Sequence, residues 1–394
     1  MHILEIPSFF PPYGGLFCLD QAKALKALGH EVRILSNVQL GATTGLRNFL
    51  RLPYGRYEHE MDGITVYQSY HRGVPKMIRH NVSRWVAIVQ SMFTDYVKQY
   101  GKPDILHAHC AKWAGYAAML IGRQYGIPYV ITEHLPKEVF EVEFGPAPSS
   151  AWALPCLKEA YEKAVCVITV SEELFSDIAC YFGKSYCHQA IPNIIDVDFF
   201  AYRERVRKKD SPFRFCCPAI FVARKGYDVL FRAFDLLTQT EPNVRLSICG
   251  QGTDGKSCRR MVQGMTCREK VDCLGVLDKT GVRQLLYDSD ALVLASRGES
   301  QGLVLLEAMS TGIPALSTKA IPASVRLSSG LQYVDIDDAE ALMHEMLLAV
   351  RTPLPHGRQL SAQVRQFAAS EVIGAKIASL FQNVLSERAV PRTS

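Results

Sequence analysis

Short apolar runs alternate with amphipathic stretches of helical length along this 394-residue chain. An apolar run at 3–6 is followed by a proline and glycine loop at 11–15, a helical stretch at 17–28 and a second apolar run at 31–36. Further strands are expected at 105–107, 129–132 and 166–170. Between them, apolar residues recur at helical spacing and predict a helix: Ile78, Val82, Trp85, Val86, Val89 and Phe93. Strands and helices that alternate in this way are typical of open α/β sheets.

The alternation stops near residue 191 and resumes after a polar, basic stretch, with strands expected at 215–222, 245–249, 271–274 and 291–294. The chain is also too long for one ordinary hydrophobic core. We therefore predict two Rossmann-like, doubly wound domains that face a cleft. The first spans residues 1–192, a hinge spans 193–212 and the second domain spans 213–365. The segment 366–394 is expected to be helical and to pack back on the first domain.

Composition excludes several classes of protein. No window holds the roughly 18 uninterrupted apolar residues of a membrane-spanning helix. An acidic residue, Glu5, interrupts the first apolar run and no basic leader precedes it, so a cytoplasmic protein is expected. The twelve cysteines contain no Cys-x-x-Cys pair, and Cys216 and Cys217 are adjacent. This spacing fits neither a zinc site nor a disulfide framework, so free, buried thiols are expected, with no metal and no cofactor.

The net charge of +5 is mild and does not indicate nucleic acid. Basic residues do gather between 72 and 102, where Asp95 is the one acid among six basic side chains. Such runs are usually solvated faces. This run also leaves room for phosphorylated ligands, or for peripheral contact with the anionic inner face of the cytoplasmic membrane.

The most informative stretch of the chain is 295–309, which follows an expected strand and opens a helix. A helix that begins near Gly302 would present free backbone N–H groups, at Gly302, Leu303 and Val304, to an anion such as a phosphate. Glu299 precedes the helix and Glu307 lies about one and a half turns into it. Two carboxylates on either side of an anion site suit a nucleoside diphosphate sugar. The same sequence is also compatible with a Glu299 that only caps the helix and a Glu307 that is an ordinary surface residue.

This stretch resembles the Glu-x7-Glu motif of the retaining glycosyltransferases called family four or group one, which have the GT-B fold. Glu299 and Glu307 occupy the two glutamate positions, and Glu-Ala-Met followed by Gly-Ile-Pro continues the match. The resemblance implies that Glu299 is catalytic. It also implies that Gly302, Leu303, Val304 and Glu307 bind the donor.

The first half of the chain resembles the same family in the same order. The loop with Gly14 and Gly15 looks like the family's first loop, where the backbone meets the donor phosphate or the acceptor. The strand end Asp-Ile-Leu-His-Ala-His implies that His109 reaches the transferred sugar. Glu133 and His134 follow the next strand, at an edge where α/β sites gather, and are candidates for the acceptor or sugar side.

The second half carries a Lys-Gly motif at 225–226 and a Gly-x-Gly turn at Gly250 and Gly252. The resemblance implies that Lys225 binds the donor diphosphate, where a cation would stabilise the leaving group. The family's arginine five residues earlier is replaced by Ile220, and Arg224 is the candidate substitute. Smaller departures occur at Gln301, at Ala295 with Ser296, and at Ile321 with Pro322.

The resemblance implies a hexosyltransferase that moves a sugar from a UDP- or GDP-sugar to a glycan or lipid-linked acceptor. The anomeric configuration would be retained, and the expected setting is cell-surface polysaccharide or lipopolysaccharide synthesis. Three alternatives remain. A sugar-nucleotide epimerase shares the two-domain shape, and a non-catalytic sugar-nucleotide-binding or scaffold protein would explain the missing arginine. A dinucleotide-dependent oxidoreductase would need a Gly-x-Gly-x-x-Gly spacing that Gly14 and Gly15 lack.

Overall fold

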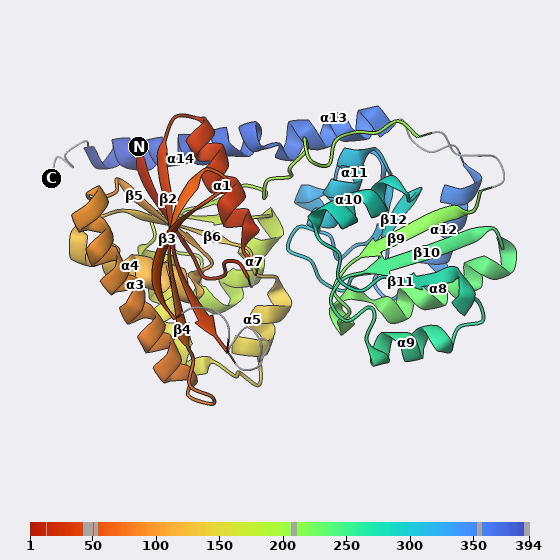
Figure 1. The fold of residues 1–394 in the computed structure, drawn as a ribbon, viewed down its shortest axis with the longest axis horizontal. Helices are drawn as coiled ribbons and strands as arrows, with labels where there is room; N and C mark the ends of the chain where they lie inside the picture. Colours follow the sequence, from red (N-terminus) through yellow and green to blue (C-terminus); the bar gives the residue numbers. More distant parts are fainter. Residues whose placement is uncertain (13, 42–49, 51–53, 206–210, 353–356, 390–394) are drawn as a thin grey trace. The chain divides into compact units, whose positions relative to one another are not determined.

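The structure is a computed structural model that describes residues 1–12, 14–41, 50, 54–205, 211–352 and 357–389. Tyr13 of the first loop and residues 206–210 of the expected hinge lie outside the described residues. The chain forms two compact units, which are described one at a time (Figure 1). Unit 1 comprises Met1–Ile194 together with the C-terminal segment from Ser370. Unit 2 comprises Ile195–Ala369.

Within the described residues, the sheet of unit 1 has eight strands in the order β3-β4-β2-β1-β5-β6-β7-β8. Neighbouring strands are parallel except for β3 and β4, which are antiparallel. The strands are β1 His2–Pro7, β2 Glu31–Leu40, β3 Gly55–Met61, β4 Ile64–Arg72, β5 Ile105–His109, β6 Tyr129–Glu133, β7 Cys166–Thr169 and β8 His188–Ala190.

Helices cover both faces of this sheet, because successive side chains of its strands point to opposite sides. Ile3 of β1 lies in a core shared with helices α1 and α14, whereas Leu4 and Ile6 lie in a second core shared with α3, α4 and α6. The helices of unit 1 are α1 Leu16–Ala27, α3 Ile78–Tyr100, α4 Tyr116–Tyr125, α5 Lys137–Phe144, α6 Leu154–Lys163, α7 Glu172–Phe182 and α14 Ser370–Ala389.

The described part of unit 2 holds a parallel sheet of six strands in the order β11-β10-β9-β12-β13-β14. Its strands are β9 Phe213–Pro218, β10 Val244–Cys249, β11 Val271–Cys273, β12 Ala291–Leu294, β13 Ala315–Thr318 and β14 Leu331–Val334. Its helices are α8 Tyr227–Thr240, α9 Lys256–Gln263, α10 Lys279–Tyr287, α11 Leu303–Thr311, α12 Ala339–Arg351 and α13 Gly357–Ala368. The predicted fold class, two doubly wound α/β domains, is therefore confirmed.

Each sheet has one point where the strand order reverses. In unit 1 the chain runs outward from β1 and then returns to β5 on the other side of β1; in unit 2 it returns from β11 to β12, on the other side of β9. Ligands of open α/β sheets bind at such points, beyond the carboxyl ends of the strands. All twelve cysteines are free. No helix in the described part of the chain is long and apolar enough to cross a membrane.

Candidate active site

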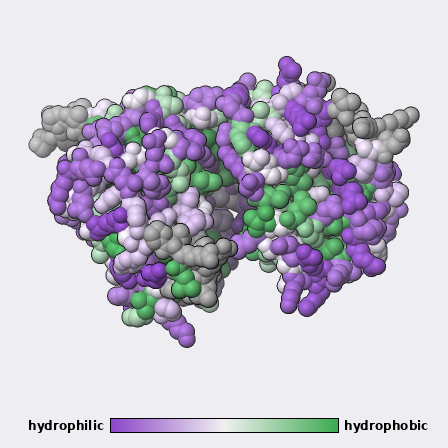
Figure 2. All heavy atoms as spheres, in the orientation of Figure 1, coloured by the Kyte–Doolittle hydropathy of each residue, from purple (hydrophilic) through white to green (hydrophobic). Residues whose placement is uncertain are grey.

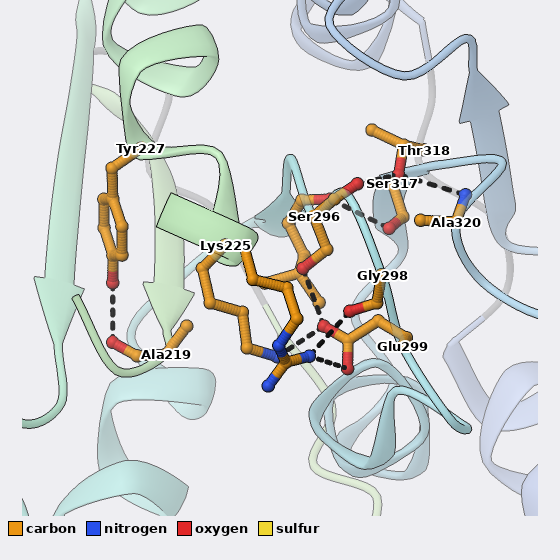
Figure 3. A network of polar contacts seen from close by, with 11 residues as sticks. Ala219, Lys225, Tyr227, Ser296, Gly298, Glu299, Ser317, Thr318 and Ala320 are labelled. Carbon is orange, nitrogen blue, oxygen red and sulfur yellow. Dashed lines mark hydrogen bonds and ion pairs between the residues drawn. The ribbon is translucent and has the colours of Figure 1, made fainter. Parts of the chain in front are cut away.

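Two loops of unit 2 meet where its strand order reverses, one after β9 and one after β12. The ammonium group of Lys225 is paired with Oε1 of Glu299, and the hydroxyl of Ser296 donates to the same oxygen at 2.6 Å (Figure 3). The guanidinium of Arg224 donates to the carbonyl oxygen of Gly298 at 2.6 Å and lies 3.6 Å from Oε2 of Glu299. Two cations therefore converge on one carboxylate whose side chain is only 8% exposed.

Arg297 fixes the approach of the two loops. Its guanidinium donates to both carboxylate oxygens of Asp228, at 3.0 and 2.6 Å, and to Asp337 at 2.7 Å. The loops pass so closely at Gly226 that a Cβ atom there would lie 1.8 Å from the carbonyl oxygen of Ala295. The glycine after Lys225 is thus required for the two loops to meet, which explains why the motif pairs the two residues.

Helix α11 begins directly after this carboxylate. Gly302, with φ of 80°, precedes its first turn, which holds no acidic residue and has no side-chain cap. The backbone N–H groups near Leu303 and Val304 therefore lie at a helix tip with partial positive charge. Glu307 is half-buried further along the same helix. The sequence-predicted residues Lys225, Arg224, Glu299 and Gly302 are thus brought together at one edge of unit 2.

Gly250 and Gly252 lie at the same edge, after β10. The N–H of Gly250 donates to the carbonyl oxygen of Gly275 at 2.7 Å, so the loops after β10 and β11 are joined. Exposed apolar side chains follow β9 and β11, namely Ile220, Val222, Leu274 and Val276. Figure 2 shows apolar side chains gathered on the visible face of unit 2. Ile220, where the family has arginine, contributes to this exposed apolar group.

In unit 1, the strand reversal holds a buried chain of polar side chains. Oε2 of Glu5, on β1, lies 2.7 Å from Nε2 of His109 and 2.8 Å from Nδ1 of His107, both on β5. Nδ1 of His109 lies 3.1 Å from Nε2 of His134, which follows β6. The ring of Phe17, at the start of α1, stacks on His134 with centroids 3.8 Å apart. Gly14 and Gly15 form the loop that leads into α1.

Burial and charge determine the protonation states of these buried side chains. The two histidines of β5 lower the pKa of the Glu5 carboxyl to about 2, against the opposing effect of burial. Burial lowers the pKa of His109 to about 4 and also lowers the pKa of His134. At neutral pH, Glu5 is therefore ionised and His109 and His134 are neutral.

Two of the predicted site residues are fully buried in unit 1. His109 is 0% exposed, and its two ring nitrogens lie within hydrogen-bond distance of Glu5 and His134. The carboxylate of Glu133 is also fully buried. It accepts from Tyr161 at 2.7 Å, from the N–H of Ala111 at 3.1 Å and from those of His134 and Leu135 at 3.0 Å. The carboxylate of Glu133 therefore links the backbone that follows β5 and β6 to helix α6.

The sequence prediction did not include Glu5 or Phe17 as site residues. The signal for Glu5 was present, because a carboxylate inside a buried strand requires partners. Its place opposite His107 follows from the pairing of β1 with β5, which sequence alone does not supply.

Among the described residues, Glu5, His107 and His109 are also the group whose side chains could hold a metal ion. Oε2 of Glu5 is hydrogen-bonded to Nε2 of His109 at 2.7 Å, and all three side chains are fully buried. Nδ1 of His107 lies 2.8 Å from the same oxygen without the geometry of a hydrogen bond, and Oε1 of Glu5 has no hydrogen-bond partner among the described residues.

A cavity of about 390 Å³ lies next to this chain, at the carboxyl ends of β1, β2 and β5. Ser8 connects the two features, since its N–H donates to the carbonyl oxygen of His109 at 3.1 Å. The lining combines aromatic and polar side chains and includes Phe9, Phe10, Gln39, Trp85, Lys112 and Trp113.

Comparison with known proteins assigns both units. The family model described as Glycosyltransferase Family 4 matches residues 14–199, and the model described as Glycosyl transferases group 1 matches residues 198–365. The putative teichuronic acid biosynthesis glycosyltransferase TuaC of Bacillus subtilis is 25% identical over 338 residues, covering 81% of each chain.

Two solved structures share the fold over nearly the whole chain. The sucrose-phosphate synthase of Thermosynechococcus elongatus has a TM-score of 0.78 and 18% identity, covering 98% of this chain and all of its own. The Anabaena protein HepE, in complex with UDP, has a TM-score of 0.71 and 17% identity, covering 97% of this chain and all of its own. With the fold and both family models in agreement, the chain belongs to the family 4, group 1 glycosyltransferases of the GT-B fold.

Proposed function

We propose that this glycosyltransferase takes a hexose from a UDP- or GDP-sugar and transfers it, with retention of configuration, to a glycan or lipid-linked acceptor. The expected setting is the synthesis of cell-surface polysaccharide or lipopolysaccharide. The observation that carries the proposal is the convergence of Lys225, Arg224 and the tip of α11 around Glu299. That is the arrangement a diphosphate leaving group requires, with cations and backbone N–H groups at one place.

In this site, the bound diphosphate replaces Glu299 as the partner of Lys225 and Arg224. Lys225 and Arg224 form the charge-assisted contacts that stabilise the departing nucleotide. Glu299, released from Lys225, accepts from hydroxyls of the transferred sugar, and Glu307 accepts from the ribose. The exposed apolar residues after β9 and β11 offer a surface on which the base can lie, beside the Gly250–Gly252 turn. The UDP complex of HepE, which shares the fold, supports a nucleotide ligand.

The relatives support the setting at the level of their names. TuaC is named for teichuronic acid biosynthesis. We extend that class of pathway to this chain.

A donor panel tests the proposal. The purified chain is incubated with UDP-glucose, UDP-galactose, UDP-N-acetylglucosamine and GDP-mannose, with and without a mixture of glycan acceptors, and free UDP or GDP is measured. We expect nucleotide release from at least one donor, and faster release when an acceptor is present. Binding of UDP or GDP without any release from any donor would instead favour a non-catalytic sugar-nucleotide-binding protein.

A further inference from the structure

Two free cysteines lie side by side at the edge of the sheet of unit 1. Cys166 begins β7, and Cys187 directly precedes β8. The thiol of Cys187 donates to the sulfur of Cys166 at 3.4 Å. Cys166 is 0% exposed, whereas Cys187 is exposed to solvent. A buried thiol is thus in contact with a thiol that a reagent in solution can reach.

The pairing of the two strands brings these sulfurs together. β7 and β8 are parallel, with Val167 opposite His188, and the N–H of Val167 donates to the carbonyl oxygen of Cys187 at 2.9 Å. One residue earlier on each strand, Cys166 lies opposite Cys187. Neighbouring strands lie about 4.8 Å apart, and Cα atoms joined by a disulfide lie about 4.4–6.8 Å apart. The backbone therefore already has the spacing that a disulfide requires.

Aromatic contacts hold the residues on both sides of Cys187. The ring of His188 stacks on that of Phe175, which belongs to α7, with centroids 3.5 Å apart. The ring of Tyr186 meets Phe175 edge-on at 5.7 Å and stacks on Tyr161, which belongs to α6, at 5.6 Å. Packing on α6 and α7 thus fixes the backbone around Cys187. The two sulfurs need to approach by only about 1.4 Å to reach the length of a disulfide bond.

We propose that Cys166 and Cys187 are a reversible thiol–disulfide pair that exchanges with small-molecule disulfides such as glutathione disulfide. In the described part of the sheet, β8 pairs with β7 alone, and it is the last strand before the boundary between the units at Ile194. The disulfide closes a loop that contains α7 and joins β8 covalently to the strand beside it. Oxidation therefore pins the end of the first segment of unit 1.

The reaction proceeds in two exchange steps. The thiolate of Cys187, the exposed partner, attacks one sulfur of glutathione disulfide, forms a mixed disulfide and releases one glutathione. Cys166 then attacks the sulfur of Cys187, which forms the internal disulfide and releases the second glutathione. Two cysteine sulfurs are oxidised, one glutathione disulfide is reduced, and the protons of the two cysteine thiols end on the two glutathione thiols.

The order of the two steps follows from burial. Burial raises the pKa of the Cys166 thiol, and no solvent reaches it, so Cys166 reacts poorly with a disulfide in solution. Its contact with Cys187 supplies the proximity that the second step needs.

Equilibration with glutathione tests the pair. The reduced chain is incubated with mixtures of glutathione and glutathione disulfide, alkylated, and mapped by peptide mass spectrometry. We expect a peptide that links Cys166 to Cys187 and that dithiothreitol separates again. In Cys166→Ser, Cys187 should instead stop at the mixed disulfide with glutathione, at a level about tenfold higher than in the wild type. Cys180→Ser is the matched control, because Cys180 is exposed and donates to the backbone of its own helix, and its loss should leave the linkage unchanged.

Hydrogen exchange tests the effect on β8. The N–H of Ile191, which donates to the carbonyl oxygen of Thr169 at 2.9 Å, should exchange about tenfold more slowly in the oxidised wild type than in the reduced one. Cys187→Ser should show no such difference, and it replaces Cys166→Ser as the comparison if that variant does not fold. Accumulation of the glutathione adduct on Cys187 in the wild type, or linkage of Cys187 to another cysteine, overturns the pairing. Equal exchange in both states with the linkage formed overturns the pinning of β8.

Discussion

Nε2 of His109 lies 2.7 Å from Oε2 of Glu5, and this one contact sets the direction of every hydrogen bond that follows it. An ionised carboxylate only accepts, so His109 must carry its proton on Nε2. Its Nδ1 then accepts, and the neutral His134, at 3.1 Å, must donate from Nε2. We therefore assign His109 a positioning role: it transmits the orientation imposed by Glu5 to His134.

The first prediction concerns the substitution of His109. The amide nitrogen of glutamine can reach the position of Nε2, so His109→Gln can still donate to Glu5, whereas His109→Ala cannot. We expect His109→Gln to keep more of the transfer rate and His109→Ala to lose about 10²-fold or more. Thermal unfolding of both variants checks that they fold. Equal, severe loss in both would show that the imidazole itself contacts the sugar.

The same arrangement predicts a spectroscopic result that needs no substrate. Long-range proton–nitrogen NMR at pH 7 should show His109 and His134 protonated on Nε2, and Glu5→Gln should abolish the preference in at least one ring, because a glutamine amide can donate as well as accept. A bound divalent metal at Glu5, His107 and His109 would give a different nitrogen shift that a chelator reverses. That result would replace the hydrogen-bonded interpretation.

Stability should fall in mild acid. Burial lowers the pKa of both His71 and His109 to about 4, from an ordinary value of 6.5. The folded state thus favours the neutral rings, so the contribution is complete above pH 6.5 and is lost as the pH falls from 6.5 to 4. Each ring contributes a slope of about 1.4 kcal/mol per pH unit within that window. Urea unfolding at several pH values measures it, and His109→Asn should remove one histidine's share. A flat profile between pH 6.5 and 4 would contradict the assignment.

Donor affinity should depend on the cation cluster of unit 2. Lys225→Ala and Arg224→Ala each remove a charge-assisted contact worth about 1.5–3 kcal/mol, so UDP or GDP binding should weaken by roughly 10–150-fold. Arg232→Ala is the control, because Arg232 forms an exposed ion pair with Glu340 on the same unit. Calorimetric titration compares the three variants. An unchanged affinity in Arg224→Ala would show that it does not replace the arginine absent at Ile220.

Sequence reasoning identified the features that depend on local pattern. The helix α11 begins at Leu303, one residue after the predicted Gly302, because a glycine with positive φ precedes a run of helix-forming residues. It did not identify contacts between distant residues. Glu5 and His109 are 104 residues apart and meet only because β5 returns beside β1. The burial of Glu133 depends in the same way on Tyr161, which is 28 residues away.

Peripheral membrane contact remains a prediction, now with a more definite location. At the start of α3, Met77 is 50% exposed and Ile78 is 59% exposed, and the basic residues Lys76 and Arg79 flank them. Two other basic side chains of the stretch have partners within the protein. Arg84 donates to the carbonyl oxygen of Arg72, and Lys98 lies near Asp95. Basic residues near an anionic surface contribute about 1 kcal/mol each, so attachment should be weak and reversible.

Flotation with phosphatidylglycerol liposomes checks this prediction. We expect binding at low salt that is removed at about 0.5 M salt, where the screening length is roughly 4 Å. The double variant Met77→Ser with Ile78→Ser should weaken it, and Leu348→Ser, an exposed position on unit 2, should not. No flotation at low salt would reject membrane contact through this surface.

The stereochemical outcome follows from where the charges of unit 2 converge. In the proposed function, Lys225, Arg224 and the tip of α11, which lie near Glu299, would hold the leaving diphosphate on one face of the sugar. An acceptor hydroxyl that arrives on that face can pass its proton to the departing phosphate oxygen, so no separate protein base is needed. Inversion would need a base within about 3 Å of the acceptor hydroxyl on the opposite face. His109, the base that the sequence offers, is fully buried between Glu5 and His134.

We therefore expect an α-linked product from an α-linked glucosyl or galactosyl donor. Proton NMR of the first product should show the small anomeric coupling of an α-glycoside. His134→Gln provides a further check, because a role for this ring as an inverting base would abolish transfer, whereas a contact to a sugar hydroxyl would only reduce its rate. A large coupling in the wild-type product, which indicates a β-glycoside, would refute retention. Inversion would then require a base on the face of the sugar opposite the diphosphate.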